Sequence, residues 1–179
     1  MLSSITINDL FIIKPYTMNI YKLIIISTLT LFFSCNSKAQ KQTKDTSSTY
    51  KITKTEAEWK AQLSEKEFYV LRKAGTERPF SSPLNKNNKK GTYTCAACGT
   101  PLFKSEHKFD SGTGWPSFDR EIKGNVAYGT DNKLGYSRNE EHCATCGGHL
   151  GHVFNDGPRE TTGKRHCING AALKFIPEK

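Results

Sequence analysis

The sequence lacks three features, and each absence narrows the class of protein. It has no internal repeat with a period of about 20–50 residues, which excludes solenoids and other repeat architectures. It has no apolar run long enough for a clear membrane span, because the run within "YKLIIISTLTLFFSC" holds only about twelve mostly apolar residues. It also has no long block of one charge: 26 Lys and Arg stand against 17 Asp and Glu, and the basic residues are spread along the chain. Spread lysines are typical of a solvated surface rather than of a nucleic-acid patch.

The first 34 residues differ in composition from the rest of the chain. A lysine precedes the short apolar run, and small residues follow it, which is the pattern of a secretion signal. Cys35 at this boundary resembles the lipid-acceptor cysteine of bacterial lipoproteins, although Phe32 stands where leucine is usual. A plain anchor helix is the alternative. We predict a signal peptide over 1–34 that begins at Met1 or Met18, lipid on Cys35, and export to the bacterial cell envelope, with the domain facing the periplasm.

The rest of the chain divides into a linker and a domain. Residues 35–54 are rich in Lys, Thr, Ser and Gln with one aromatic residue, Tyr50, and are predicted to be a flexible linker. The segments "TEAE" and "SEKE" are capping boxes that predict short helices at about 55–62 and 64–74. From Phe80 onward, short β-type runs alternate with Gly, Asn, Asp and Pro. The sequence therefore predicts a mainly antiparallel β domain behind two helices.

Four of the six cysteines form two CxxC pairs, Cys95/Cys98 and Cys143/Cys146. A two-residue gap lets both sulfurs of a pair reach one tetrahedral metal ion, so two such pairs predict a structural Zn²⁺ site with four thiolates. Two alternatives remain for an exported protein. The cysteines could form disulfides, or one pair could be a redox-active CxxC.

Cys167 has no such partner and lies in "KRHCING". If this segment is a strand, Arg165, Cys167 and Asn169 share one face. A guanidinium beside a thiol favours the thiolate and lowers the pKa of the thiol, which is typical of an activated nucleophile. A buried, inert cysteine is the alternative.

Histidines and an aromatic residue accompany this cysteine. His149 and His152 lie three residues apart in "GGHLGHVFNDGP", and either general acids or metal ligands fit that pattern. Trp115 lies in a Gly- and Pro-rich segment, "DSGTGWPSF". An aromatic residue in such a loop is either core filler or a wall for an apolar ligand.

The segments "CAAC", "DSGTGWPSF", "SRNEEHCATCGGHLGHVFNDGP" and "KRHCING" together resemble the B type of methionine sulfoxide reductase, over about residues 55–177. The resemblance implies a domain over 55–179 with two antiparallel sheets, short N-terminal helices and structural zinc on the four paired cysteines. It implies that Cys167 is the catalytic cysteine. It assigns the remaining site positions to His149, His152, Asp156, Arg165 and Asn169 as polar active-site residues, to Arg138 and Glu140 near them, and to Trp115 and Phe154 as substrate-binding residues.

The implied reaction is reduction of the R epimer of methionine sulfoxide, here in oxidised exported proteins. It needs a thiolate, a proton donor (His149 or His152, held by neighbours such as Asp156) and an apolar seat for the S-methyl group. Attack leaves a sulfenic acid on Cys167, which an external thioredoxin-like thiol must reduce. Many family members carry a resolving cysteine where this chain has Thr113, so its recycling route differs.

Two other protein classes share part of the pattern. A zinc-ribbon nucleic-acid module would explain the CxxC pairs and the basic charge, but neither the export signal nor Cys167. A zinc hydrolase needs an open metal position, which four cysteines do not leave. We therefore expect a monomeric enzyme that binds no nucleic acid and reaches the membrane through its lipid anchor.

Overall fold

The computed structural model describes residues 50–179. The predicted signal peptide, Cys35 and most of the predicted linker lie outside the described residues. The described end of the linker contacts the domain: the backbone N–H of Ile52 donates to Thr145 O at 2.9 Å, and the ring of Tyr50 packs against Gly147. Among the described residues, contacts with the domain thus include Tyr50 and Ile52, a few residues before the predicted boundary at 55.

Two helices begin the domain, as predicted. Helix α2 is Glu56–Gln62 and helix α3 is Glu65–Lys73, and each has a complete capping box, from Thr55 and Ser64 respectively. Each cap hydroxyl accepts a backbone N–H that has no partner within the helix, and this fixes the start of the helix. Helix α3 buries Phe68, Val70 and Leu71 against the β domain. In the part of the chain described, no helix combines the length and apolar character that a membrane crossing requires.

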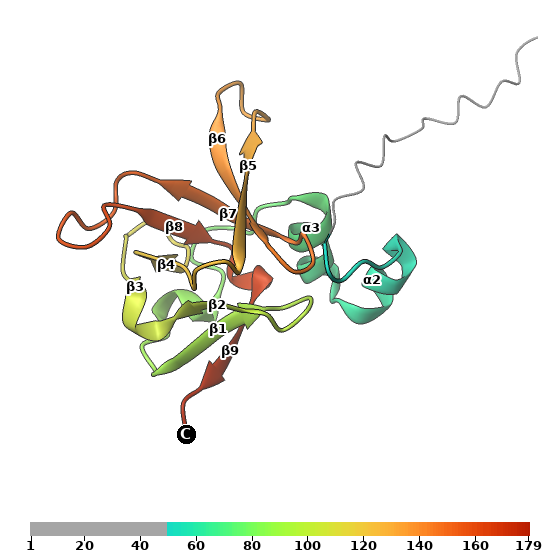
Figure 1. Cartoon of the computed structure of the whole chain (residues 1–179), viewed down its shortest axis with the longest axis horizontal. Coiled ribbons are helices and arrows are strands. Elements are labelled where there is room, and N and C mark those ends of the chain that lie inside the picture. Colours follow the sequence, from blue (N-terminus) through green and yellow to red (C-terminus); the bar gives the residue numbers. More distant parts are fainter. Residues whose placement is uncertain (1–49) are drawn as a thin grey trace, which may run out of the picture. The chain divides into compact units, whose positions relative to one another are not determined.

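The strands of residues 50–179 form two antiparallel sheets (Figure 1). The smaller sheet has the order β2-β1-β9, with β1 Gly91–Cys95, β2 Pro101–Lys104 and β9 Leu173–Pro177. The larger sheet has the order β3-β4-β8-β7-β6-β5, with β3 Lys108–Phe109, β4 Ser117–Phe118, β5 Val126–Asp131, β6 Arg138–Cys143, β7 His149–Phe154 and β8 Arg165–Ile168. Short 3-10 turns are η2 Pro83–Lys86, η3 Ser105–His107 and η4 Gly170–Ala172. The predicted fold class, mainly β with two antiparallel sheets and short N-terminal helices, is confirmed.

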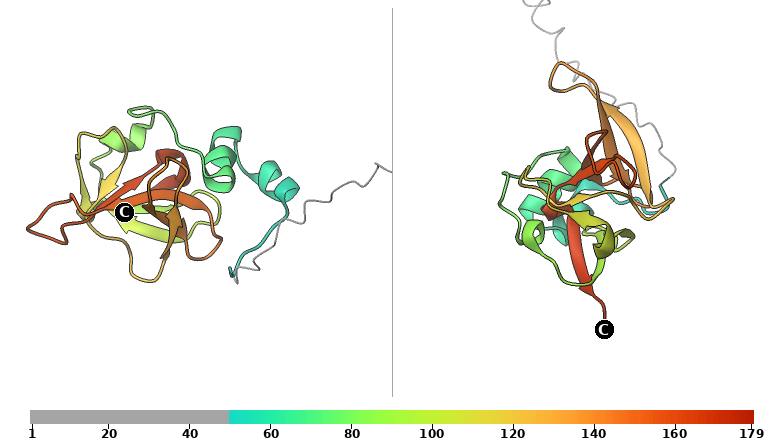
Figure 2. Two further views of the ribbon diagram at one scale, coloured as in Figure 1. Left: turned by 90° about the horizontal axis from the view of Figure 1, so that it is seen from above. Right: turned by 90° about the vertical axis from the view of Figure 1, so that its left-hand side faces the viewer.

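Aromatic side chains fill the space between the sheets. The ring of Phe103 from β2 stacks on Phe118 from β4 with centroids 4.4 Å apart, and Tyr93 from β1 meets Phe118 edge-on at 5.0 Å. All three side chains are fully buried. This core holds β8 in the middle of the larger sheet, while the β5–β6 hairpin projects beyond the other strands in Figure 1 and in the right-hand view of Figure 2.

Candidate active site

The four paired cysteines converge where the turn after β1 of the smaller sheet meets the turn after β6 of the larger sheet. Cys95 ends β1 and Cys143 ends β6, and each is followed by the same tight turn, in which a glycine N–H returns to the carbonyl of the first cysteine at 2.8 Å. The Sγ atoms of Cys95 and Cys146 are 3.8 Å apart, and those of Cys98 and Cys143 are 3.5 Å apart. Tetrahedral bonds of about 2.3 Å place sulfurs roughly 3.8 Å from one another, whereas a disulfide needs about 2.05 Å. The donor set and its spacing therefore fit one metal ion, and no disulfide joins the cysteines of residues 50–179.

Cys167 lies on β8, flanked on both sides by paired strands. Its register partners are Ser117 on β4 and His152 on β7. The thiol is half-buried, and Thr113 Oγ1 lies 3.8 Å from Cys167 Sγ. Burial raises the pKa of the Cys167 thiol, while the Thr113 hydroxyl and the charge of Arg165 oppose this without overcoming it. Arg165 thus lowers the pKa of this thiol, as predicted, but in the free protein burial is the larger effect and the net pKa is raised.

Asp156 contacts Arg165 and not a histidine, which corrects the role assigned from the sequence. Two hydrogen bonds of 2.9 Å run from the Arg165 guanidinium to the two carboxylate oxygens of Asp156. The guanidinium also lies over the ring of Phe154, 4.5 Å from its centroid. Asp156 thus orients Arg165, and Arg165 in turn supports one aromatic wall of the site.

His152 is held by Asp131, a residue that sequence reasoning missed. His152 Nε2 lies 2.9 Å from Asp131 Oδ2, and Arg138 Nη2 contacts the same oxygen at 2.5 Å. A hydrogen bond from the backbone N–H of Lys133, together with those from His152 and Arg138, holds the pKa of Asp131 below its usual range. Asp131 is therefore ionised and accepts the His152 Nε2–H. Burial lowers the pKa of His152, so its ring is neutral at pH 7.

His149 is held by Glu140 on the neighbouring strand. His149 Nδ1 and Glu140 Oε1 are 2.5 Å apart. Burial lowers the pKa of His149 to about 4, although the negative charge of Glu140 acts in the opposite direction. His149 Nε2 is buried and has no hydrogen-bond partner among the described residues. The sequence treated the two histidines alike, whereas the structure gives each its own carboxylate.

A bulge places both histidines on the same side of the sheet. Residues three apart on a regular strand point to opposite faces. In β7, however, Gly151 pairs with Glu141 and His149 pairs with His142, so one extra residue, Leu150, is accommodated between them. Such an insertion re-aims the side chains that follow it. The rings of His149 and His152 consequently lie 5.5 Å apart.

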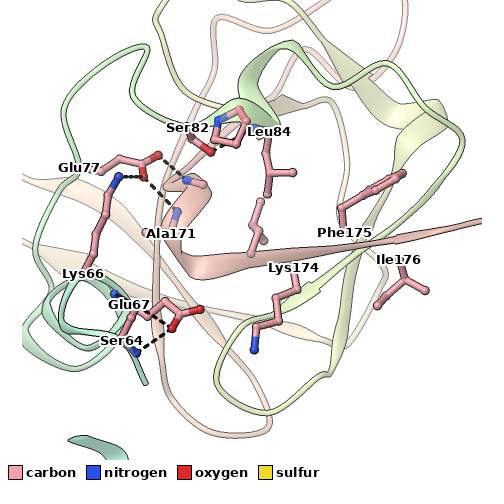
Figure 3. A pocket seen from close by; sticks show the side chains of 13 residues that line it. Ser64, Lys66, Glu67, Glu77, Ser82, Leu84, Ala171, Lys174, Phe175 and Ile176 are labelled. Carbon is pink, nitrogen blue, oxygen red and sulfur yellow. Dashed lines mark hydrogen bonds and ion pairs between the residues drawn. The ribbon is translucent and has the colours of Figure 1, made fainter. Parts of the chain in front are cut away.

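Asn169 and Trp115 are both tied to Glu77, another residue that the sequence did not single out. Asn169 is buried; its Oδ1 accepts the backbone N–H of Glu77 at 3.0 Å and its Nδ2 donates to Leu150 O at 2.9 Å. Trp115 Nε1 donates to Glu77 O at 3.2 Å. The Glu77 carboxylate accepts the backbone N–H groups of Gly170 at 2.5 Å and Ala171 at 3.0 Å (Figure 3). An isolated glutamate in a loop gives no sequence pattern that reveals this role.

These side chains surround a cleft of about 120 Å³, whose lining is Thr76, Trp115, Arg138, Gly151, His152, Phe154, Cys167 and Asn169. Trp115 and Phe154 supply aromatic walls, and Cys167 supplies a thiol. Within residues 50–179 the lining does not include His149, Arg165 or Asp156. The cleft therefore combines an apolar seat, a thiol and a neutral imidazole held by a carboxylate.

Comparisons with known proteins agree with this geometry. The SelR domain model matches residues 63–177. The peptide methionine sulfoxide reductase MsrB of Leptospira interrogans is 52% identical over 130 residues, which cover 72% of this chain and 98% of that protein. The MsrB of Methanosarcina mazei is 53% identical over 130 residues, covering 72% and 92%, and that of Agrobacterium fabrum is 50% identical over 128 residues, covering 71% and 94%. The cleft that contains Cys167 and the cluster of four cysteines both lie within the matched residues. The chain therefore belongs to the SelR domain family, the family of the MsrB peptide methionine sulfoxide reductases.

Proposed function

We propose that this protein reduces methionine R-sulfoxide in proteins to methionine, with Cys167 as the nucleophile. The observation that carries the proposal is the position of Cys167 in an aromatic-walled cleft, directly across from His152 in the β7–β8 pairing. Family membership supports the reaction class, and the narrow apolar cleft suits a thioether side chain.

The cleft residues suggest the following sequence of events. The S-methyl group of the sulfoxide packs against Trp115, which the bond to Glu77 holds in place. The neutral His152 ring takes the proton of the Cys167 thiol, and Asp131 stabilises the imidazolium that forms. The thiolate sulfur attacks the sulfoxide sulfur while His152 protonates the sulfoxide oxygen. The S–O bond and the new S–S bond then break, the electron pair of the S–S bond stays on the methionine sulfur, and the hydroxyl passes to Cys167, so that a thiol and a sulfoxide become a sulfenic acid and methionine.

The pKa directions in the free protein define the protonation states from which this route starts. The thiol pKa is raised and the imidazole pKa is lowered, so the ground state is a neutral thiol beside a neutral imidazole. The thiol's own proton is then the one that the sulfoxide oxygen requires, and no further proton is consumed. Residues Cys95, Cys98, Cys143 and Cys146 would hold Zn²⁺, which closes its coordination shell with four thiolates and stabilises the turns without entering the reaction.

The experiment is an assay of residues 36–179 on both sulfoxide epimers with dithiothreitol. We expect turnover of the R epimer alone, and loss of that turnover in Cys167→Ser with the metal retained. His152→Gln should lower kcat, whereas the matched control His107→Gln, on η3, should not. Substantial turnover by Cys167→Ser would contradict the proposal.

We propose further that the sulfenic acid is reduced by an exported thioredoxin-like protein. Thr113 lies beside Cys167, where many family members carry a resolving cysteine, and the four paired cysteines would be occupied by the metal that their arrangement fits. A sulfenic-acid-specific trap followed by mass spectrometry after a single turnover should label Cys167.

The lipoprotein assignment stays a proposal based on the sequence. We propose that Cys35 carries lipid and holds the domain at the membrane for repair of oxidised exported proteins. Cys35→Ser should release the protein from the membrane fraction. Equal recovery of both forms in that fraction would favour an anchor helix instead.

A further inference from the structure

A second group of metal-ligating side chains lies apart from the four cysteines. It consists of Glu140 and His142 on β6 and His149 on β7, whose ligand atoms all lie within 4.8 Å of one another. One carboxylate oxygen, Glu140 Oε1, is 3.2 Å from His142 Nε2 and 2.5 Å from His149 Nδ1. Two imidazole nitrogens thus converge on a single oxygen.

The sheet itself produces this convergence. Glu140 and His142 are two residues apart on one strand and therefore share a face. His142 and His149 are register partners across the β6–β7 pair, because of the bulge at Leu150. On the other side, Gly129 of β5 leaves room for the His142 ring, since a Cβ there would lie 3.0 Å from His142 Cε1.

The donor set suits a divalent transition metal. Imidazole and carboxylate are ordinary ligands of Zn²⁺, at about 2.0–2.2 Å. Such bonds place tetrahedral ligand atoms roughly 3.3 Å apart, which matches the 3.2 Å between His142 and Glu140. The 2.5 Å pair is a hydrogen bond, so an ion would replace the proton on His149 Nδ1 and separate the pair by less than about 1 Å. Three protein ligands leave one position for water.

An ion can reach this group from solvent. The side chains of His142 and Glu140 are 22% and 15% exposed, whereas that of His149 is 5% exposed. His142 has no role in the reaction proposed above and is not part of the cleft lining. Its placement over Glu140 and His149 is therefore a feature that the reaction does not explain.

We propose that Glu140, His142 and His149 form an inhibitory binding site for Zn²⁺. Bound zinc takes Glu140 away from His149 and fixes the His149 ring through Nδ1, beside the His152 ring that serves Cys167. The positive charge of the ion lies close to His152, whose ring is 5.5 Å from that of His149, and it opposes the positive charge that His152 gains in the proposed reaction. Sulfoxide reduction then stops until the ion leaves. The inhibition rests on the proposed function, whereas binding of the ion does not.

The test counts zinc by equilibrium dialysis of the full chain in detergent, with the four cysteines loaded first. Cys167→Ser is used as the background for binding, so that the catalytic thiol cannot act as a ligand. We expect two ions per chain in Cys167→Ser. When His142→Gln is added, affinity for the second ion should fall at least tenfold, so that only one ion per chain is bound at the zinc concentration that loads two in the background protein. His107→Gln is the matched control and should still take two, because His107 lies on η3 beside Glu106 and Asp119. Retention of the first ion shows that each variant is folded.

Inhibition is measured on proteins with Cys167 intact, in a single turnover without added thiol, since thiols bind zinc. Added Zn²⁺ should stop the native protein and His107→Gln, and His142→Gln should need at least tenfold more. One ion per chain in the native dialysis, or equal affinity after His142→Gln, overturns the site. Two ions without any sulfoxide reduction would refute the proposed function and leave the site standing.

Discussion

Replacement of Glu77 by glutamine tests whether this buried carboxylate holds the segment that follows Cys167. Glu77 is 5% exposed, and its two oxygens accept the N–H groups of Gly170 and Ala171 at the start of η4. Glutamine keeps the shape but turns one acceptor oxygen into a donor. One buried N–H then loses its partner and faces another N–H.

The magnitude follows from those contacts. A hydrogen bond to a charged group contributes about 1.5–3 kcal/mol, and an unpaired buried donor costs a similar amount. The ion pair between Glu77 and Lys66 adds at most about 1 kcal/mol, because Lys66 is 52% exposed. We expect Glu77→Gln to lower the free energy of unfolding by about 2 kcal/mol, which for a domain of this size lowers the Tm by roughly 8 °C.

The assay is urea and thermal unfolding of the metal-loaded protein, followed by circular dichroism. Lys66→Met is the control and should change the free energy of unfolding by less than about 1 kcal/mol. The backbone of Glu77 still bonds Asn169 and Trp115 in the variant, so activity at 25 °C should stay within a few-fold of the native value. Equal stability of Glu77→Gln and the native protein would refute the capping role, and an equal loss in Lys66→Met would assign the effect to the ion pair.

Three further changes test the metal, the thiol and the recycling route. Cys95→Ser should lose the metal and aggregate, because the binding energy of structural zinc, on the order of 10 kcal/mol, is also folding energy; a native protein without metal by elemental analysis would contradict this. Alkylation of Cys167 by iodoacetamide should still accelerate at pH 9, because burial raises the thiol pKa and the thiolate appears only as pH rises through it; a rate that levels off below pH 8 would show a lowered pKa. Thr113→Cys should form a disulfide with Cys167 after one turnover without reductant, since Thr113 Oγ1 already lies 3.8 Å from the sulfur; a disulfide between Cys167 and Cys95 in the native protein would instead make a metal ligand the resolving residue.

Local patterns determined much of the fold and predicted the candidate reactive groups. The capping boxes at Thr55 and Ser64 predicted where α2 and α3 begin, because a cap and its helix lie within four residues of one another. The CxxC spacing predicted that each pair shares one turn for the same reason. Both features depend only on residues close together in the chain, so the sequence alone was sufficient to predict them.

The partners of each functional group depended on tertiary structure. Asp131 and Glu140, which hold His152 and His149, are brought there by the β5–β6–β7 pairing, and no local spacing indicates it. The sequence instead offered Asp156, the nearest acid along the chain, and the structure pairs that residue with Arg165. Proximity in sequence was a poor guide because side chains in a sheet meet across strands.

Two properties of the site exist only in the folded protein. The bulge at Leu150 turns His149 toward His152 and His142, and a regular strand would have separated them. The pKa of Cys167 depends on the balance between desolvation and the charge of Arg165, and only the packing of β8 between β4 and β7 decides that burial is the larger effect. The sequence by itself thus determined the helix starts and the candidate reactive groups, whereas long-range strand pairing and burial determined which neighbours tune those groups, because both arise from contacts between distant segments.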